Sequence, residues 1–454
     1  MSNTRQTNGG RGRPAASTTR PQRRPGEAPT GGPVATRIEQ VRDALGDILQ
    51  WSGPADGALS RWLRAHPRLG MRDRAEVAEA VYDVLRNLRR YRQMAESGRG
   101  NATRRLAVLG LARVLGLSQV RPVLEPDEAA WLERVWNIDL ETLPRAVRHS
   151  MPDWLDEALG KMPEPESLMA ALNQPAALDI RVNPLKADRD TILAELVGHW
   201  EADGSQGPRP EATPWSPWGI RLFGRTALNR WSRFTDGSVE VQDEGSQLLA
   251  LLVGPKRGEM IIDFCAGAGG KTLLIGALMR STGRLYAFDV SQSRLARLGP
   301  RLARSGLSNV EPVTIANEND ARVKRLAGKA HRVLVDAPCS GTGTLRRNPD
   351  IKWRQNPDAL AELCELQGRI LASAARCVAP GGRLVYATCS LLEQENEAQA
   401  RAFLAAHPDF REVPVGPLLE GRSAIQVGEP YLRLRPDQHG TDGFFAAVFE
   451  RGTN

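Results

Sequence analysis

The chain has 454 residues, of which 41% are hydrophobic and 25% are charged, a composition typical of folded proteins with sizeable cores. No apolar run approaches the ~20 residues that a membrane span needs, and no apolar stretch follows the N-terminus as in a signal peptide. Five cysteines without a C-x-x-C pair argue against a disulfide framework and a zinc ribbon, so we expect a cytoplasmic protein with no metal.

Residues 1–35 form an arginine-rich tail. They hold six arginines and one glutamate, a net +5 of the overall +8, which leaves only +3 for residues 36–454. The tail has almost no large apolar residues and cannot bury enough surface to offset the entropy of folding, so we expect it to be disordered. Its composition fits a solubilising arm and a nucleic-acid-binding arm equally well.

Between residues 36 and 163 the pattern predicts an all-helical domain. Apolar residues recur at intervals of three and four in residues 38–49 and again in 77–88, as expected for helices with one buried face. Glycines and prolines interrupt the pattern between these segments and mark the turns.

Residues 164–240 predict a small α+β domain. Residues 177–182 alternate like a strand, and residues 188–197 have a helical pattern. A stretch rich in proline, tryptophan and glycine follows at 208–219.

From residue 241 to 454, short apolar strands alternate with helices. The expected strands are 260–263, 285–289, 310–315, 333–336 and 383–387, and the expected helices are 271–281, 291–304, 358–378 and 392–406. This alternation predicts a mostly parallel, doubly wound α/β sheet of the Rossmann type, with ligands at the carboxyl ends of the strands.

The first motif, residues 263–272, reads DFCAGAGGKT and lies between a strand and a helix. Its glycines allow the backbone to approach a ligand closely at a helix N-terminus. Asp289 ends the next strand 19 residues after Gly270, where a carboxylate can bind both ribose hydroxyls of a nucleoside cofactor. The motif also nearly matches the phosphate loop G-x-x-x-x-G-K-[ST], although Cys265 replaces the first glycine, so an NTPase and a plain glycine turn remain alternatives.

The second motif begins with Asp336 at the end of a strand, followed by the thiol of Cys339. Three cations, Arg346, Arg347 and Lys352, then stand beside a tryptophan. Cations next to an aromatic ring can neutralise phosphate and stack on a base, so we interpret this loop as a nucleic-acid contact. A solvated basic loop is the alternative.

The third motif places Cys389 next to a predicted helix. Ser390 and Glu393 have the spacing of a capping box, which would put Cys389 immediately before the helix N-terminus. The partial positive charge there favours thiolate over thiol. Cys364 and Cys377 lie within a helical pattern and are expected to pack inertly.

The three motifs together suit one reaction on a pyrimidine ring. When a thiolate adds to carbon 6, carbon 5 becomes nucleophilic enough to attack an electrophilic methyl group. A nucleoside-cofactor loop, a carboxylate to hydrogen-bond the base and two thiols are what this route requires.

These motifs resemble the Sun (NOL1/NOP2/Sun) family of S-adenosylmethionine-dependent RNA cytosine-5 methyltransferases. The resemblance spans residues 36–451 and is carried by residues 263–272, 336–341, 347–353, 388–397 and 442–446. Residues 180–186 and 241–247 are similar to the family's N-terminal extension, and residues 72–86 to the NusB-like domain of its bacterial 16S rRNA enzyme. The resemblance implies a NusB-like RNA-binding domain at 36–163, a small α+β RNA-binding or linker domain at 164–240, and a class I methyltransferase domain at 241–454.

The resemblance also implies a role for each matching residue. Cys389 would be the nucleophile and Cys339 would assist release of the covalent product, while Asp336 and Lys271 would hold and polarise the cytosine. S-adenosylmethionine would be bound by Cys265, Ala266, Gly267, Ala268, Gly269, Gly270, Lys271, Asp289 and Asp336, together with Asn317 or Asp320, of which the spacing favours Asn317. Gly267 and Ala268 replace the alanine and proline that the family more often carries, so the loop's rigidity is expected to differ.

The expected substrate is small-subunit rRNA, bound by a monomer without membrane or metal. Methylation of tRNA or another RNA remains an alternative, as do a P-loop NTPase and a non-catalytic RNA-binding assembly factor.

Overall fold

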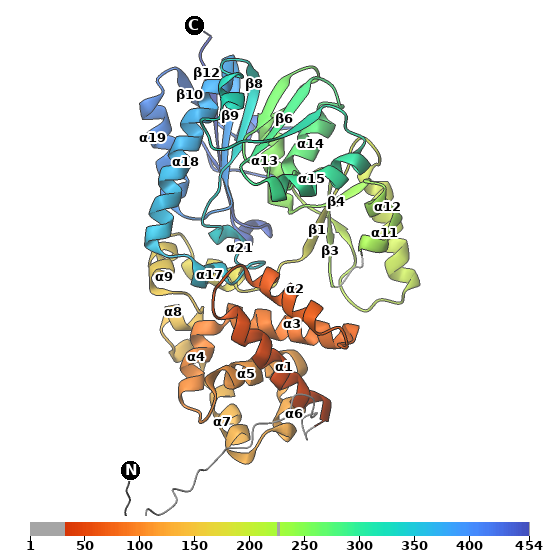
Figure 1. Ribbon diagram of the computed structural model, residues 1–454, viewed down its shortest axis with the longest axis vertical. Coiled ribbons are helices and arrows are strands. Elements are labelled where there is room, and N and C mark those ends of the chain that lie inside the picture. Colours follow the sequence, from red (N-terminus) through yellow and green to blue (C-terminus); the bar gives the residue numbers. More distant parts are fainter. Residues whose placement is uncertain (1–31, 225–227, 454) are drawn as a thin grey trace, which may run out of the picture.

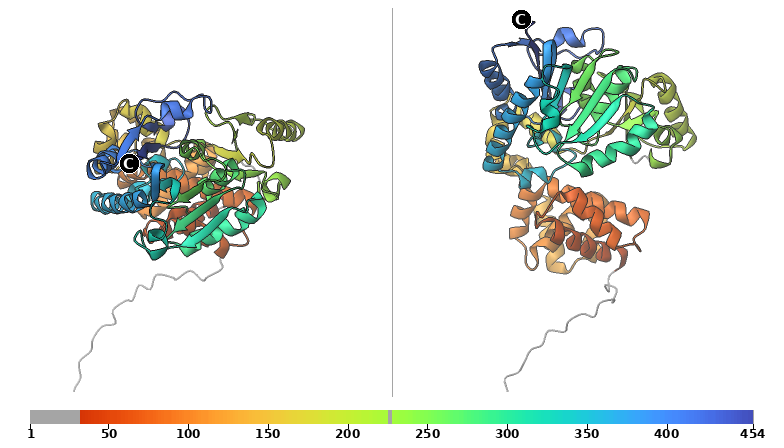
Figure 2. Two further views of the ribbon diagram at one scale, coloured as in Figure 1. Left: turned by 90° about the horizontal axis from the view of Figure 1, so that it is seen from above. Right: turned by 45° about the horizontal axis from the view of Figure 1, so that its top comes forward.

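The structure, a computed structural model, describes residues 32–224 and 228–453. Figure 1 shows a helical bundle at one end, a large α/β body at the other, and a small sheet with its helices beside that body. Figure 2 confirms that the bundle lies below the body when the molecule is turned.

The N-terminal bundle consists of helices whose apolar faces meet in one core. Its members are α1 (Gly32–Ile48), α2 (Ala55–Ala65), α3 (Met71–Arg86), α4 (Leu88–Glu96), α5 (Ala102–Leu115), α6 (Leu117–Val120) and α7 (Pro126–Trp136), with the 3₁₀ turns η1 (Arg121–Val123) and η2 (Leu140–Thr142). Buried Ile38, Val81 and Leu109 lie in this core, as their spacing predicts. Helix α1 begins at Gly32, so the last four residues of the predicted tail are helical; residues 1–31 lie outside the described residues.

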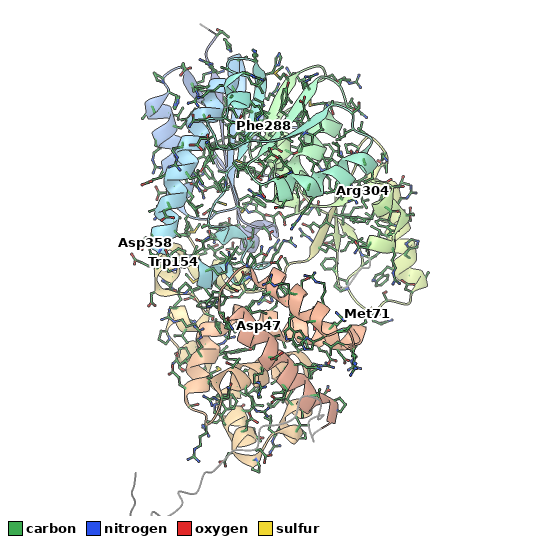
Figure 3. The ribbon with its side chains drawn as sticks, viewed as in Figure 1. Asp47, Met71, Trp154, Phe288, Arg304 and Asp358 are labelled. Atoms are coloured by element: carbon green, nitrogen blue, oxygen red, sulfur yellow. The ribbon has the colours of Figure 1, made fainter. Side chains whose placement is uncertain are left out.

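Three further helices connect the bundle to the body. They are α8 (Arg145–Arg148), α9 (Asp153–Gly160) and α10 (Pro165–Leu172). Leu155 and Leu168 share one hydrophobic cluster with Leu345 and Leu391 of the body. Figure 3 shows Trp154 of α9 close to Asp358, at the start of the long helix α18 (Pro357–Cys377).

The small sheet is antiparallel, with the strand order β2-β3-β1-β4. Its elements are β1 (Leu178–Val182), α11 (Arg189–Ala202), β2 (Glu211–Ala212), β3 (Gly219–Leu222), η3 (Leu228–Arg230), α12 (Ser232–Thr235) and β4 (Val239–Val241). Ile180, Ile192 and Ile220 pack between the sheet and α11. The strand predicted at 177–182 and the helix predicted at 188–197 are both present.

The large sheet has the order β10-β12-β9-β8-β5-β6-β7, with β11 paired to β12. Its strands are β5 (Met260–Asp263), β6 (Arg284–Asp289), β7 (Val310–Thr314), β8 (Ala330–Asp336), β9 (Val378–Thr388), β10 (Phe410–Val413), β11 (Leu432–Leu434) and β12 (Phe444–Arg451). Strands β5 to β9 are mutually parallel, which confirms the predicted Rossmann-like α/β sheet. The sequence did not predict the three C-terminal strands, which pair antiparallel.

Helices cover both faces of this sheet. They are α13 (Glu244–Val253), α14 (Gly270–Leu278), α15 (Gln292–Ser305), α16 (Ala321–Lys324), α18, α19 (Glu397–Ala406) and α20 (Gly416–Leu419). The short helices α17 (Ile351–Arg354) and α21 (Pro436–His439) lie below the sheet, toward the bundle, in Figure 1. Successive strand residues face opposite ways, so Ile261 packs with α13 and α14 while Ile262 packs with α18 and α19.

The strand order reverses between β5 and β8, the point at which doubly wound sheets bind ligands. The antiparallel β12 runs upward to the C-terminus in Figure 1, so the parallel strands end at the opposite edge, facing the helical bundle. All three predicted motifs follow strands that end at this edge.

Candidate active site

The glycine loop connects β5 to α14 at the switch point. Gly267 and Gly269 have positive φ angles of +56° and +83°, a conformation that L side chains rarely adopt. A Cβ on Gly269 would lie 2.2 Å from Leu298, so the loop packs tightly on that side. A Cβ on Gly267 would meet nothing within 4 Å, so the loop backbone at that residue borders open space.

Two buried carboxylates flank this loop. Asp289 accepts the Gly267 N–H at 2.8 Å and pairs with Arg294 at 2.9 Å. Asp263 accepts the Thr272 hydroxyl at 2.7 Å through one oxygen, while its buried Oδ1 has no partner. Burial raises the pKa of Asp263 to about 7. A buried acceptor without a partner calls for a donor, so the open side of the loop and the free oxygen of Asp263 fit a cofactor with hydroxyl or ammonium groups.

Asp320 and Asn317 follow β7, farther along the same edge. The Asp320 carboxylate accepts the N–H groups of Ala316 and Arg322 at 2.9 and 2.8 Å, and thereby caps α16. Asn317 is exposed and its side-chain oxygen accepts the Asn319 N–H at 2.8 Å. Asp320 is therefore committed to capping a helix, whereas Asn317 occupies the exposed part of the loop.

Lys271, in the first turn of α14, forms an ion pair with Asp336 at the end of β8, with 2.7 Å between Nζ and Oδ2. Burial alone would lower the pKa of Lys271, but Asp336 raises it above its ordinary value. The ammonium also lies 5.7 Å from the centre of the Phe444 ring. Lys271 is therefore a cation held in a fixed position, and Phe444 is a site neighbour that sequence reasoning missed.

The two thiols of the second and third motifs lie side by side, with 3.3 Å between the Cys339 and Cys389 sulfur atoms. Contact with Cys389, followed by burial, raises the pKa of Cys339 well above its ordinary value. Charge on Cys389 is among the influences that raise the pKa of Lys271. Cys339 is thus a neutral thiol at pH 7, and Cys389 lies within the field of the Lys271 ammonium.

The predicted capping box at Ser390 and Glu393 is wrong. Helix α19 begins only at Glu397, after the 3₁₀ turn η5 (Glu393–Glu395). The Ser390 hydroxyl instead accepts the Leu392 N–H at 3.0 Å and lies 3.2 Å from the Thr342 hydroxyl. These contacts with the second-motif loop outweigh the local capping pattern. Cys389 is not at a helix N-terminus, and Lys271 is the positive charge that acts on it.

The helical placement predicted for Cys364 and Cys377 is confirmed. Cys364 and Cys377 lie within α18, and burial raises the pKa of each to about 11. Cys265 packs against the core of the sheet, and burial raises its pKa well above the ordinary value.

Arg346 and Arg347 are ion-paired within the protein, so they are not the free cations that the sequence interpretation expected. Arg346 is mostly buried and pairs with Asp442, and Arg347 pairs with Asp243 at 2.9 Å. Both carboxylates raise the pKa of Arg347 in spite of its burial. These guanidinium groups are therefore neutralised inside the protein.

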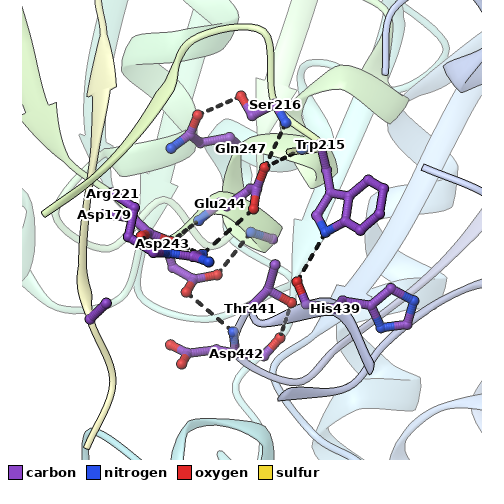
Figure 4. Close-up of polar contacts among 12 residues, drawn as sticks. Asp179, Trp215, Ser216, Arg221, Asp243, Glu244, Gln247, His439, Thr441 and Asp442 are labelled. Atoms are coloured by element: carbon purple, nitrogen blue, oxygen red, sulfur yellow. Dashed lines mark hydrogen bonds and ion pairs between the residues drawn. The ribbon is translucent and has the colours of Figure 1, made fainter. Parts of the chain in front are cut away.

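The aspartates of this cluster belong to a larger polar network, shown in Figure 4. Asp243 accepts the backbone N–H of Asp442 at 3.2 Å, and fully buried Glu244 accepts the N–H of Ser216 at 2.7 Å. Trp215 donates to the carbonyl of His439 at 2.9 Å. The network connects the loop that precedes Phe444 and β12 to the start of α13.

Lys352 also does not contact solvent or nucleic acid. It is 1% exposed, and its ammonium donates to the carbonyls of Arg86 and Ser150 at 2.7 and 2.9 Å and to Asn173 Oδ1 at 2.8 Å. Trp353 donates to the carbonyl of Leu85 at 2.8 Å. This part of the second motif anchors the helical bundle to the body.

Removing the Lys352 anchor should destabilise the protein. Lys352→Met leaves three buried acceptors without their donor, and we expect a loss of ~2–4 kcal/mol in unfolding free energy. Urea unfolding followed by tryptophan fluorescence measures the change. The matched control is Lys329→Met, since Lys329 is exposed; equal midpoints for the two variants would contradict the anchoring role.

Arginines of β1 and α15 hold the glycine loop in place through hydrogen bonds to its backbone carbonyls. Arg181 of β1 donates to the carbonyl of Gly270 at 2.8 Å, and Arg301 donates to that of Ala268 at 2.7 Å. Glu240 of β4 pairs with Arg301 at 3.0 Å. Sequence reasoning missed these contacts because they join segments far apart in the chain.

A groove with a volume of about 1540 Å³ lies between the helical bundle and the segment that leads to the small sheet. Seven arginines, three carboxylates and the rings of Tyr82, Tyr91 and Trp136 line it. Arg346 and Arg347 stand at its border with the second motif.

Within residues 32–224 and 228–453, no group of three or more His, Cys, Asp or Glu side chains could hold a metal ion. Nor does any helix in these ranges have the length and hydropathy to cross a membrane.

The fold and the site together define a Rossmann-like methyltransferase, and comparison with known proteins gives its family. Residues 250–450 match the model of the 16S rRNA methyltransferase RsmB/F family. The probable ribosomal RNA small subunit methyltransferase B of Synechocystis is 34% identical over 444 residues, 90% of this chain and 97% of the relative. The corresponding enzyme of Sodalis glossinidius is 38% identical over 309 residues, 68% of this chain and 67% of the relative. The chain belongs to the RsmB/F methyltransferase family.

Solved structures agree with this assignment. The crystal structure of PH0851 superposes with a TM-score of 0.74 at 28% identity, covering 92% of this chain and 98% of the other. NSun6 from Pyrococcus horikoshii, solved with SFG, gives a TM-score of 0.57 at 21% identity, covering 67% of this chain and 98% of the other, and supports the fold. The family resemblance predicted from the motifs is confirmed, and the NTPase alternative is set aside.

Proposed function

We propose that the chain methylates carbon 5 of cytosine in RNA, with 16S rRNA as the substrate, through a covalent adduct between Cys389 and carbon 6 of the base. The observation that carries this proposal is the pair of thiols 3.3 Å apart, beside the Lys271–Asp336 ion pair, next to the glycine loop. The names of the relatives, small subunit methyltransferase B, support this choice of substrate.

Four side chains of this protein act on the base. The Cys389 thiolate forms a bond to carbon 6, and the electron pair of the 5,6 double bond becomes available at carbon 5. Asp336 and Lys271 hold the ring and stabilise the charge that develops on it. Once carbon 5 carries the methyl group, a base takes the carbon 5 proton, the electron pair of that C–H bond re-forms the 5,6 double bond, and the pair of the sulfur–carbon bond returns to Cys389; Cys339 assists this release.

The geometry around the loop supports a set of cofactor-binding residues. S-adenosylmethionine, when bound, supplies an electrophilic methyl group. The loop from Cys265 to Lys271 would lie against it, Asp289 would accept its ribose hydroxyls, and Asp336 would border it. Asn317 is proposed for the adenosine end because the carboxylate of Asp320 already caps α16.

We also propose that residues 36–163 act as a NusB-like RNA-binding domain and that residues 164–240 place the RNA and support the cofactor loop. The groove along the bundle is basic and contains aromatic rings, a combination that binds phosphate and unstacked bases. Arg90 and Arg113 are candidates for phosphate contacts within it.

Sequencing of rRNA tests the function. Bisulfite sequencing of a strain lacking the protein should show one cytosine of 16S rRNA that has lost methylation, and the gene supplied in trans should restore it. Loss of methylation only in tRNA would overturn the rRNA assignment. If purified protein fails to bind S-adenosylmethionine by calorimetry, the methyltransferase proposal fails in favour of a non-catalytic assembly factor.

A further inference from the structure

Glu395 is a buried carboxylate directly behind the Cys339 thiol. It is 0% exposed and lies at the end of η5, within the third motif. One oxygen accepts the Ser340 N–H at 2.7 Å and the Gln367 side-chain amide at 2.9 Å, and the other accepts the Ser340 hydroxyl. All of these partners, within the described part of the chain, are neutral groups.

Burying the Glu395 carboxylate without a cationic partner costs folding free energy, so the residue is expected to have a role that offsets this cost. Two of its contacts fix the residue that follows Cys339. Gln367, which holds the carboxylate, also donates to the carbonyl of Pro338 at 2.9 Å, the residue that precedes Cys339. Glu395 and Gln367 therefore fix the residues on both sides of Cys339, which are Ser340 and Pro338.

The charges around the two sulfur atoms are arranged asymmetrically. The field of Glu395 is one of the causes that raise the pKa of Cys339, after contact with Cys389 and burial. On the other side, Cys389 lies in the field of the Lys271 ammonium, which Asp336 holds. Tyr386 also faces Cys339, and burial raises the pKa of its phenol, so it remains neutral. The Glu395 carboxylate therefore acts on Cys339, and the Lys271 ammonium acts on Cys389.

We propose that Glu395 is a positioning residue that keeps Cys339 as a neutral thiol, so that Cys389 is left as the nucleophile of the pair. The Cys339 S–H can then donate a hydrogen bond to the Cys389 thiolate across the 3.3 Å separation. This inference rests on the proposed function, because it explains which of two adjacent thiols attacks the base.

Alkylation by iodoacetamide tests the inference without RNA or cofactor. The initial rates at Cys339 and Cys389 are measured between pH 6 and 10 by mass spectrometry of the full-length protein. In the wild type we expect Cys389 to react at lower pH than Cys339. In Glu395→Gln, which keeps the shape and most hydrogen bonds but removes the charge, the Cys339 profile should move down by ~1 pH unit, so its rate at pH 7 should rise about tenfold.

Two variants separate charge from structure. Glu393→Gln removes an exposed carboxylate from the same turn, paired with Arg401, and should leave both profiles unchanged. Ser340→Ala removes one hydrogen bond while Glu395 keeps its charge, so the order of the two thiols should persist. The inference is overturned if Cys339 ionises first in the wild type, or if folded Glu395→Gln gives the wild-type profiles. Failure of the proposed function would appear separately, as the absence of an RNA adduct at Cys389 in the wild type.

Discussion

Cys389→Ala should abolish methyl transfer, with a loss of at least ~10³-fold in kcat, and should form no covalent species with RNA. Cys339→Ala should also lose turnover but should accumulate an RNA–protein species that survives denaturant. The reason is the order of events, because one sulfur makes the bond to carbon 6 and the other is needed only when that bond breaks. The two thiols are 3.3 Å apart, so both can reach the same base.

Denaturing gel electrophoresis with labelled 16S rRNA fragments and S-adenosylmethionine distinguishes the two variants. Cys364→Ala is the matched control, since this thiol lies in α18 and donates to the Gln394 carbonyl at 3.5 Å rather than facing the pair. It should retain wild-type turnover. If Cys389→Ala accumulated the adduct and Cys339→Ala did not, the roles of the two thiols would have to be exchanged.

The parallel half of the large sheet was predictable because each strand is a short apolar run bounded by a loop motif. Strands β5, β6 and β8 were found within a few residues of their true ends. Strands β10 and β11 have only four and three residues, too few to show a period. Strand β12 is buried on both faces from Phe444 to Phe449, so it lacks the alternation that identifies a strand with one exposed face.

The candidate site was predictable where neighbours in the chain remain neighbours in space. Lys271 begins the helix after β5 and Asp336 ends the neighbouring strand β8, so parallel topology brings them together. Arg346 and Lys352 could not be interpreted correctly, because their partners are Asp442, Arg86 and other residues far away in the sequence. A loop with several cations looks the same whether it binds phosphate or holds two domains together, and only the tertiary partners distinguish the two.

Asp336→Asn should lower kcat/KM for RNA methylation by roughly 10²–10⁴-fold, the range over which a positioned acid–base group contributes. In the proposed mechanism the carboxylate holds the cytosine directly, and it also keeps Lys271 charged. Without Asp336, burial would dominate and lower the pKa of Lys271. The residual activity of the variant should therefore fall as pH rises, because the buried lysine loses its proton at a lower pH than in the wild type.

The single variant Lys271→Met and the double variant Lys271→Met/Asp336→Asn test whether the two groups act together. If the two groups act as one unit, the double variant should be scarcely worse than either single variant, since each single change already breaks the pair. Asp358→Asn, at an exposed position in the first turn of α18, is the control and should have wild-type kinetics. If the losses in kcat/KM were strictly additive, Lys271 and Asp336 would contribute independently. If the pH profile of Asp336→Asn were also identical to that of the wild type, the ion pair would not set the charge of the lysine.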